Sequence, residues 1–286
     1  MSYFDHDGCQ LHYEQYGHGT PGCDAPGYGA PGCGAPILLV HGLGSSTRDW
    51  EYQIPELASH YRVIALDVRG HGRSDKPHEH YSISGFAEDV VALIDHLGLD
   101  SVHLVGISMG GMIGFQLAVD HPHLLKSLTI VNSGPEVKPK TPRDYLEVAK
   151  RWSLSRLLSL NTIAKALGKL LFPKPEQAEL RRKIEERWPQ NDKRAYLASL
   201  DAIIGWGVRE RLARITCPTL VISADRDYTS VAEKQAYVNE LPNARLLVIE
   251  DSRHATPLDQ PQRFNSSLLA FLSEVETAAP THDKDP

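Results

Sequence analysis

The sequence has 286 residues, of which 41% are hydrophobic and 23% are charged. This length and composition can support a full hydrophobic core, which excludes a disordered chain. The formal net charge of -6, with no run of Lys or Arg, argues against a surface that binds nucleic acid. No apolar run is long enough to span a bilayer, and residues 1–7 lack the basic and apolar segments of an export signal. We therefore expect a soluble, cytoplasmic protein with no nucleic-acid partner and no membrane span.

The first predicted strand covers residues 9–16, whose alternating polar and apolar side chains fit an edge strand. A Pro-Gly-x-x-Ala unit is then repeated within residues 21–36, and this density of proline and glycine predicts a surface loop. The alternative is that Cys23 and Cys33 of the repeat form a metal or redox pair. Because the four cysteines include no CxxC pair, we expect no metal site, no disulfide framework and a reducing compartment.

A short apolar run at residues 36–40 has the composition of a strand buried on both faces of a parallel sheet. It leads into the turn His41-Gly-Leu-Gly, and such turns at the carboxyl ends of strands are where open α/β sheets bind ligands. The turn predicts half of an oxyanion hole, with the backbone N–H of Leu43 as donor. A phosphate loop is the alternative, but no Lys or Ser/Thr stands at the Walker spacing. His41 is a candidate base, although hydrogen bonding to the backbone of the turn is preferred.

Strand and helix patterns alternate up to residue 131. The predicted elements are helix 49–57, strand 61–66, helix 82–97, strand 101–105, helix 111–118 and strand 127–131. This order predicts an α/β fold in which a parallel sheet carries helices on both faces. After strand 61–66, Asp67 and Arg69 could be a catalytic carboxylate and an anion clamp. Because glycines and Ser74 surround them, a turn held by its own salt bridge and hydrogen bonds is preferred.

The segment Gly106-Ile-Ser-Met-Gly110 joins strand 101–105 to the next helix. A strand that turns abruptly into a helix strains the residue between them, and only small neighbours let the backbone close so tightly. Ser108 would then stand exposed at the tip, and the N–H of Met109 would complete the oxyanion hole. The alternative is a glycine-rich turn in which the serine only caps the helix.

The pattern changes between residues 134 and 212, where apolar residues recur at helical spacing without buried strand runs. We expect a helical cap over the carboxyl edge of the sheet, which would bury part of a ligand. The residues expected to line the substrate pocket are Met112, Trp152, Trp188 and Trp206. The alternative for each tryptophan is packing within the cap.

Two further strands, residues 218–223 and 244–249, are followed by Asp227 and His254 respectively. Both residues would lie at the same sheet edge as Ser108. A serine becomes a nucleophile when a nearby base takes its proton, and a carboxylate that holds the base improves the reaction. His254 would be the base and Asp227 the orienting acid, in a chain order found in one class of triads.

These motifs, in this order and each at a strand end, resemble those of the α/β-hydrolase family over nearly the whole chain. The segments that carry the resemblance are HGLG at 41–44, DVRGHGRS at 67–74, GISMGG at 106–111, the aspartate after PTLVIS and the late histidine. The resemblance implies that Ser108 is the nucleophile, Asp227 the acid and His254 the base, with no metal or other cofactor. Leu43 and Met109 are the implied oxyanion donors. The nearest groups are carboxylesterases, enol-lactonases and cofactor-free haloperoxidase-like or perhydrolase-like enzymes.

Two other carboxylates are candidates for the acid. Asp225 lies close to Asp227 in the sequence. Glu136 follows the strand at 127–131, a place where some relatives carry the acid. The spacing of Asp227 from its strand fits the family pattern better. The repeat at 21–36 stands where relatives usually have a tight hairpin. A serine nucleophile argues against dehalogenase and epoxide-hydrolase chemistry, which needs a carboxylate to form the alkyl ester.

The predicted organisation is a hydrolase core of residues 1–133 and 213–286, interrupted by a helical cap of residues 134–212. The predicted activity is hydrolysis of a small-molecule carboxylic ester or lactone through an acyl-enzyme. Two alternatives stay open. A similar triad could hydrolyse a carbon–carbon bond in a ring-cleavage product, or the fold could serve as a ligand receptor with little turnover.

Overall fold

The computed structural model describes residues 2–17 and 34–278. Within these residues, eight strands form one sheet in the order β1-β2-β4-β3-β5-β6-β7-β8. Strand β2 pairs antiparallel with β1 and β4, and the remaining neighbours are parallel. The strands are β1 (Ser2–His6), β2 (Cys9–Tyr16), β3 (Pro36–Val40), β4 (Arg62–Leu66), β5 (Val102–Ile107), β6 (Leu125–Val131), β7 (Thr219–Ala224) and β8 (Ala244–Ile249). The proposed Cys23 and Cys33 pair lies outside the described residues.

Strand β2 is not an edge strand, because β1 precedes it and pairs with it. The hairpin between them turns at Asp7 and Gly8, whose φ angles of 52° and 76° lie in the left-handed region. Asp and Gly tolerate this region better than most residues, so a two-residue turn can form here. The prediction that residues 9–16 form an edge strand is therefore wrong, and β1 takes that place.

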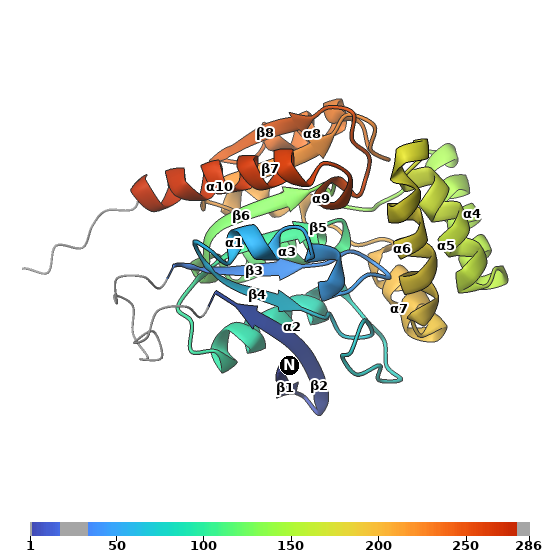
Figure 1. Cartoon of the computed structure of the whole chain (residues 1–286), viewed down its shortest axis with the longest axis horizontal. Coiled ribbons are helices and arrows are strands. Elements are labelled where there is room, and N and C mark those ends of the chain that lie inside the picture. Colours follow the sequence, from blue (N-terminus) through green and yellow to red (C-terminus); the bar gives the residue numbers. More distant parts are fainter. Residues whose placement is uncertain (1, 18–33, 279–286) are drawn as a thin grey trace, which may run out of the picture.

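Helices cover both faces of the sheet (Figure 1). They are α1 (Ile54–Leu57), α2 (Ile83–His96), α3 (Met109–Asp120), α4 (Pro142–Leu157), α5 (Leu160–Leu171), α6 (Ala178–Arg187), α7 (Lys193–Ile203), α8 (Val231–Val238), α9 (Thr256–Asp259) and α10 (Pro261–Ala278). The helix expected at residues 49–57 is divided into the 3₁₀ turn Thr47–Trp50 and α1. None of the described helices combines the length and the apolar composition needed to cross a bilayer.

The central strands are apolar on both faces because a layer of helices packs on each. Leu38 and Val40 of β3 belong to the cluster formed with α2 and α3, whereas Ile37 and Leu39 belong to the cluster formed with α10. Successive side chains of a strand point to opposite faces, so this alternation divides the core into two layers. Both layers hold the parallel strands in register.

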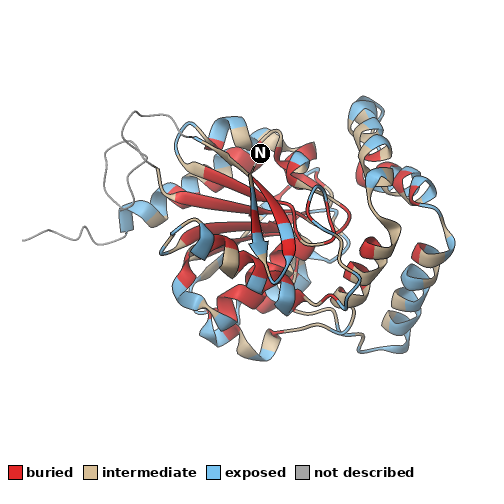
Figure 2. Cartoon of the chain, turned by 90° about the horizontal axis from the view of Figure 1, so that it is seen from below, coloured by how far each residue is buried: buried red, intermediate tan, exposed pale blue. Residues whose placement is uncertain are grey.

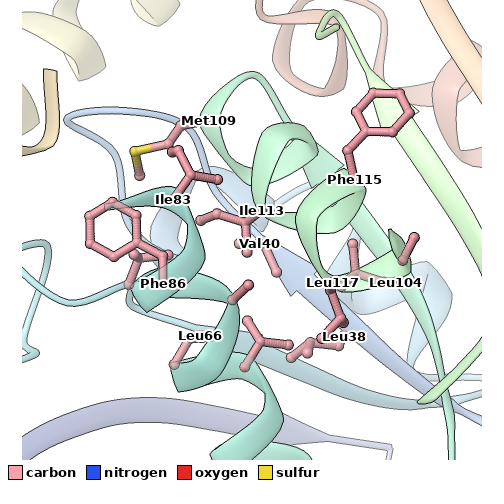
Figure 3. Close-up of a cluster of buried hydrophobic side chains, with 14 of the residues drawn as sticks. Leu38, Val40, Leu66, Ile83, Phe86, Leu104, Met109, Ile113, Phe115 and Leu117 are labelled. Carbon is pink, nitrogen blue, oxygen red and sulfur yellow. The ribbon is translucent and has the colours of Figure 1, made fainter. Parts of the chain in front are cut away.

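Helix α3 is anchored in the first of these layers. Figure 3 shows its residues Ile113 and Leu117 among side chains of α2 and the strands, and both are fully buried, as is Phe115. Burying one large apolar side chain contributes about 1.5–3 kcal/mol. The start of α3, and with it the residue just before it, is therefore fixed by the core.

Helices α4 to α7 form a cap beside the end of the sheet toward which the parallel strands point (Figure 1). The cap is more exposed than the core (Figure 2), and Tyr145, Leu146 and Leu157 are 61–80% exposed. Local signals start its helices, since the side chains of Thr141 and Asp192 accept hydrogen bonds from the first turns of α4 and α7. The predicted α/β class, with a mostly parallel sheet, helices on both faces and a helical cap, is confirmed. The division at residues 134 and 212 stays a prediction.

Two glycines, Gly106 and Gly110, allow the backbones of β5, β3 and α3 to approach one another closely. A Cβ atom on Gly106 would lie 2.2 Å from the carbonyl oxygen of Gly110, and one on Gly110 would lie 2.1 Å from that of Val40. Backbone atoms cannot rotate away, so these positions accept no side chain.

We expect Gly110→Ala to lower the free energy of unfolding by about 3 kcal/mol or more, because the added methyl group forces the helix away from β3. Gly134→Ala is the matched control, since its methyl group would meet Tyr237 at an ordinary 3.9 Å. Chemical denaturation of both variants measures the difference. Equal stability of the two variants would contradict this account of the packing.

Candidate active site

Ser108 stands at the turn between β5 and α3 with φ 54° and ψ -116°. A non-glycine residue in such a region costs on the order of 1–3 kcal/mol, which the surrounding structure must offset. The N–H of Ser108 donates to Val131 O at 2.9 Å, and the hydroxyl of Ser133 donates to Ser108 O at 2.7 Å. The side chain of Ser108 lines a cavity between the core and the cap. The strained turn thus presents the hydroxyl group to a ligand space.

The turn after β3 lies directly beside Ser108. A Cβ atom on Gly42 would lie 3.3 Å from Cβ of Ser108, and Gly42 and Leu43 line the same cavity. Met109 is the first residue of α3, and the first N–H groups of a helix have no intrahelical acceptor. The two predicted donors, Leu43 and Met109, therefore lie on the two segments that border Ser108.

The ring of His41 holds this turn through hydrogen bonds to the backbone. The N–H of Val68 donates to Nε2 of His41 at 3.0 Å, so Nδ1 carries the proton and donates to Gly42 O at 2.7 Å. Burial lowers the pKa of His41, which favours this neutral form. The preferred interpretation of His41, hydrogen bonding to the backbone, is confirmed.

Asp67 also has a structural role. Its carboxylate accepts hydrogen bonds from the N–H groups of Thr47 and Arg73 at 2.7 and 2.9 Å and contacts His12 at 2.9 Å. Burial alone would raise its pKa, but these partners hold the value at about 2. The preferred interpretation implied an ion pair between Asp67 and Arg69. Arg69 instead pairs with Asp89 of α2 at 2.6 Å.

Asp227 and His254 meet at the carboxyl ends of β7 and β8. Oδ1 of Asp227 lies 2.6 Å from Nδ1 of His254, and Oδ2 lies 2.5 Å from Nζ of Lys234. Burial tends to raise the pKa of Asp227, but His254 and Lys234 hold it at about 2. The carboxylate is therefore ionised across the physiological range. His254 lines the same cavity as Ser108.

The two alternative acids are engaged elsewhere. Asp225 accepts a hydrogen bond from the N–H of Ser252 at 2.9 Å and so supports the loop that carries His254. Glu136 pairs with Lys140 at 2.7 Å and with Arg209 at 3.5 Å. The pKa of Glu136 is lowered, mainly by its hydrogen bond with Lys140. The geometry therefore favours Asp227 as the partner of His254.

Asn132 was not identified from the sequence, although it fixes the His254 loop. It has a positive φ of 45°, and its Nδ2 donates to His254 O at 2.8 Å and to Thr256 Oγ1 at 2.7 Å. Its Oδ1 accepts from the N–H of Ala224 at 2.7 Å. One side chain thus joins β6, β7 and the histidine loop. Its place directly after a buried strand was the available signal.

Tyr228 and Lys234 were missed as well. The Tyr228 ring stacks on the His254 ring with centroids 4.2 Å apart, and Tyr228 lines the cavity. Lys234 is a charged residue in a polar helical segment, so nothing in its sequence context predicts the burial that the structure shows, with 1% of its side chain exposed. The start of the helix that carries Lys234 has a sequence signal, since Ser230 and Glu233 form a capping box.

The cavity has a volume of about 520 Å³. Its cap wall is largely aliphatic and is formed by Leu154, Leu158, Ile163, Ala166, Leu167, Leu170 and Leu171. Charged residues of the cap wall, Glu147, Lys150 and Arg151, are exposed on α4. A ligand would therefore meet hydrocarbon inside and charge at the rim.

Of the four predicted pocket residues, Trp188 lines this cavity, and Met112, Trp152 and Trp206 do not. Trp152 lies under Arg156 and donates to Asp201, while Trp206 donates to Gln116 at 2.7 Å. Met112 packs against the core cluster one helical turn after Ser108. Packing within the cap, the alternative considered for each tryptophan, fits the contacts of Trp152, whereas Trp206 bonds to α3 of the core.

Metal ligands are not gathered in the described part of the chain, where no group of three or more His, Cys, Asp or Glu residues could hold an ion. Cys9 and Cys217 are free thiols, and burial raises the pKa of each to about 11. Neither is therefore an activated nucleophile at neutral pH.

Comparison with known proteins agrees with this architecture. A family model described as the alpha/beta hydrolase fold matches residues 35–172. A protein of Azorhizobium caulinodans named as a carbamate hydrolase, RutD, is 32% identical over 96% of this chain and 100% of its own length. The crystal structure of the enol-lactonase from Burkholderia xenovorans LB400 is 25% identical, with a TM-score of 0.83 over 95% of this chain and 100% of that one. A solved N-acyl homoserine lactone degrading enzyme is 31% identical, with a TM-score of 0.78 over 94% and 100%.

We expect Asn132→Ala to lower the free energy of unfolding by about 2–3 kcal/mol, because the buried N–H of Ala224 loses its acceptor and the His254 loop loses its donor. Asn239→Ala, at the exposed position directly after α8, is the control and should change stability by less than about 0.5 kcal/mol. Urea denaturation gives both values. A loss below about 1 kcal/mol for Asn132→Ala would show that the loop is held by other contacts.

Proposed function

The chain belongs to the α/β-hydrolase family, and we propose that it is a serine hydrolase that cleaves a carboxylic ester or lactone through an acyl-enzyme intermediate. The observation that carries the proposal is the 2.6 Å hydrogen bond between Asp227 and His254, together with the cavity that His254 shares with Ser108. With Nδ1 held by the carboxylate, Nε2 is the ring atom left to accept a proton from serine. The assignment of these three roles is part of the proposal.

In the first step, Nε2 of His254 takes the proton of the Ser108 hydroxyl as its oxygen attacks the carbonyl carbon. The developing oxyanion accepts hydrogen bonds from the N–H groups of Leu43 and Met109. The carbon–oxygen bond to the leaving group then breaks, and His254 gives its proton to the departing alkoxide. Asp227 stabilises the imidazolium between these two transfers without taking a proton.

In the second step, His254 removes a proton from a water molecule that attacks the acyl-enzyme. The same two donors hold the second oxyanion, and the bond between Ser108 and the acyl group breaks as His254 returns its proton to the serine oxygen and the acid is released. No cofactor takes part in this sequence. The names of the similar proteins support it, because carbamates and lactones both react at a carbonyl carbon.

The cavity favours an aliphatic acyl group. Its inner cap wall consists of leucine, isoleucine and alanine side chains, and the cationic residues on that wall, Lys150 and Arg151, lie at the exposed rim. Asp49 also lines the cavity, and burial raises its pKa. Neither the position of the cationic residues at the rim nor the presence of Asp49 favours a substrate with a second carboxylate deep in the site. We therefore propose esters or lactones of uncharged alkyl acids as the substrate class.

Ser108→Ala should lower kcat on p-nitrophenyl esters by on the order of 10⁶-fold, because the nucleophile is lost while the fold is unchanged. A fluorophosphonate probe should label the wild type, and mass spectrometry should place the label on Ser108. Wild-type protein that is neither labelled by the probe nor active on any ester would contradict the proposal. Labelling without turnover on any ester would favour the carbon–carbon hydrolase or the receptor.

For p-nitrophenyl esters from acetate to octanoate, kcat/KM should rise about fourfold per added methylene until the cavity is filled, since each buried CH₂ contributes about 0.8 kcal/mol. Leu158→Trp should shorten the preferred chain, because Leu158 lines the cavity. Leu157→Trp is the matched control, since Leu157 is 80% exposed and does not line the cavity. A flat chain-length profile would refute the acyl preference while leaving the serine mechanism standing.

A further inference from the structure

Lys234 is buried directly behind the Asp227–His254 pair. Its side chain is 1% exposed, as is that of Asp227, and Nζ donates to Oδ2 of Asp227 at 2.5 Å and to Thr229 O at 2.9 Å. An ammonium group removed from water is costly unless charge and hydrogen bonds replace its hydration. The ion pair with Asp227 therefore stabilises the buried ammonium group. Because both groups are removed from water, the charge of Lys234 acts strongly on the carboxylate.

The start of α8 puts the ammonium group in place. Ser230 and Glu233 form a capping box, and the N–H of Lys234 donates to Ser230 O at 3.2 Å. The hydroxyl of Thr229 also donates to Oδ2 of Asp227 at 3.2 Å. The loop and the first helical turn thus hold one carboxylate oxygen from behind, which leaves Oδ1 facing the ring of His254.

We propose that Lys234 is a positioning residue of the triad, which orients the Asp227 carboxylate and offsets its charge so that His254 stays neutral and able to act as a base at lower pH. The inference rests on the function proposed above, because it requires His254 to be the base. Lys234 itself touches no substrate and lies outside the cavity wall.

Other charged and titratable groups lie on the elements around His254. Tyr228 stacks on the ring, Arg253 precedes it in the chain, and Arg151 of α4 lines the same cavity. Below the loop, Asp259 accepts from the N–H of Arg253 at 2.9 Å, and burial raises its pKa to about 6. On α8, the phenol of Tyr237 donates to Ser133 O and is fully buried. Of these groups, none forms an ion pair with Asp227, as Lys234 does.

The sign of the effect follows from this geometry. Without the ammonium group, the full negative charge of Asp227 would act on the ring and favour the imidazolium form. Protonated His254 cannot accept the Ser108 proton. The acid limb of the profile of kcat/KM against pH should then move to higher pH, by roughly one to two units for the loss of one nearby buried charge.

The test compares wild type with Lys234→Met and Lys234→Gln, using p-nitrophenyl butyrate from about pH 4 to pH 9, which spans the titration of histidine. Gln235→Met, on the exposed side of the same helix, is the control. A midpoint raised by one to two units in both Lys234 variants and unchanged in the control is the expected result. A uniform loss of kcat/KM with the wild-type midpoint would overturn the inference and leave a purely structural role.

A second measurement applies if the single variants do not fold. Asp227→Asn and the double variant Asp227→Asn/Lys234→Met contain no unpaired carboxylate, and the His254 ring proton can be titrated in both by NMR, assigned by its loss in His254→Gln. The double variant should titrate at higher pH, because a cation that repels the imidazolium has been removed. Identical titrations would overturn the inference. Failure of both fluorophosphonate labelling and ester turnover in the wild type would instead overturn the proposed function.

Discussion

The close approach of α3 to β3 and β5 determines the geometry of the sheet edge that carries Ser108. Gly106 and Gly110 let backbone meet backbone, and the buried face of α3 holds the helix against the sheet. Ser108 is forced into an unfavourable conformation at the one point where strand and helix join. Because core packing around α3 offsets the strain, the position of the hydroxyl group does not depend on a bound ligand. The neighbouring turn at Leu43 lies against it for the same reason.

The charges at this edge of the sheet lie apart from the proposed nucleophile, Ser108. Asp227 is ionised and contacts two nitrogen atoms, one from His254 and one from Lys234. The histidines near the Leu43 turn are kept neutral, since burial lowers the pKa of His41 and lowers that of His71 to about 3. The proposed donors at Leu43 and Met109 are neutral N–H groups, whereas the proposed acid carries a charge that is paired with Lys234. That separation suits a reaction in which negative charge develops on the substrate oxygen.

Much of this arrangement follows from sequence because it depends on local patterns. Apolar strand runs and glycine turns predict where parallel strands end, and parallel strands end at one edge, so Ser108, Asp227 and His254 were expected near one another. What was missed depends on long-range packing. The burial of Lys234 and the stacking of Tyr228 arise only when α8 and the His254 loop meet. Trp152 and Trp206 were assigned to the pocket by composition, although hydrogen bonds to distant residues decide where an indole lies.

The cap and the core differ in how tightly their residues are constrained, and this difference separates chemistry from specificity. A change at Gly110 or Asn132 alters buried packing or a buried hydrogen-bond network, so it carries a large cost in stability. Leu154 and Leu170 of the cavity wall are 44% and 48% exposed, so substitutions there remove little packing. Cap residues can therefore vary in size and polarity while the strained turn and the Asp227–His254 pair stay in place. Trp188 is where the two parts meet, because its ring packs against the turn at Gly44 while it also lines the cavity. A substitution at Trp188 would act on both the oxyanion side and the acyl space, which no other cap tryptophan in the described residues is placed to do.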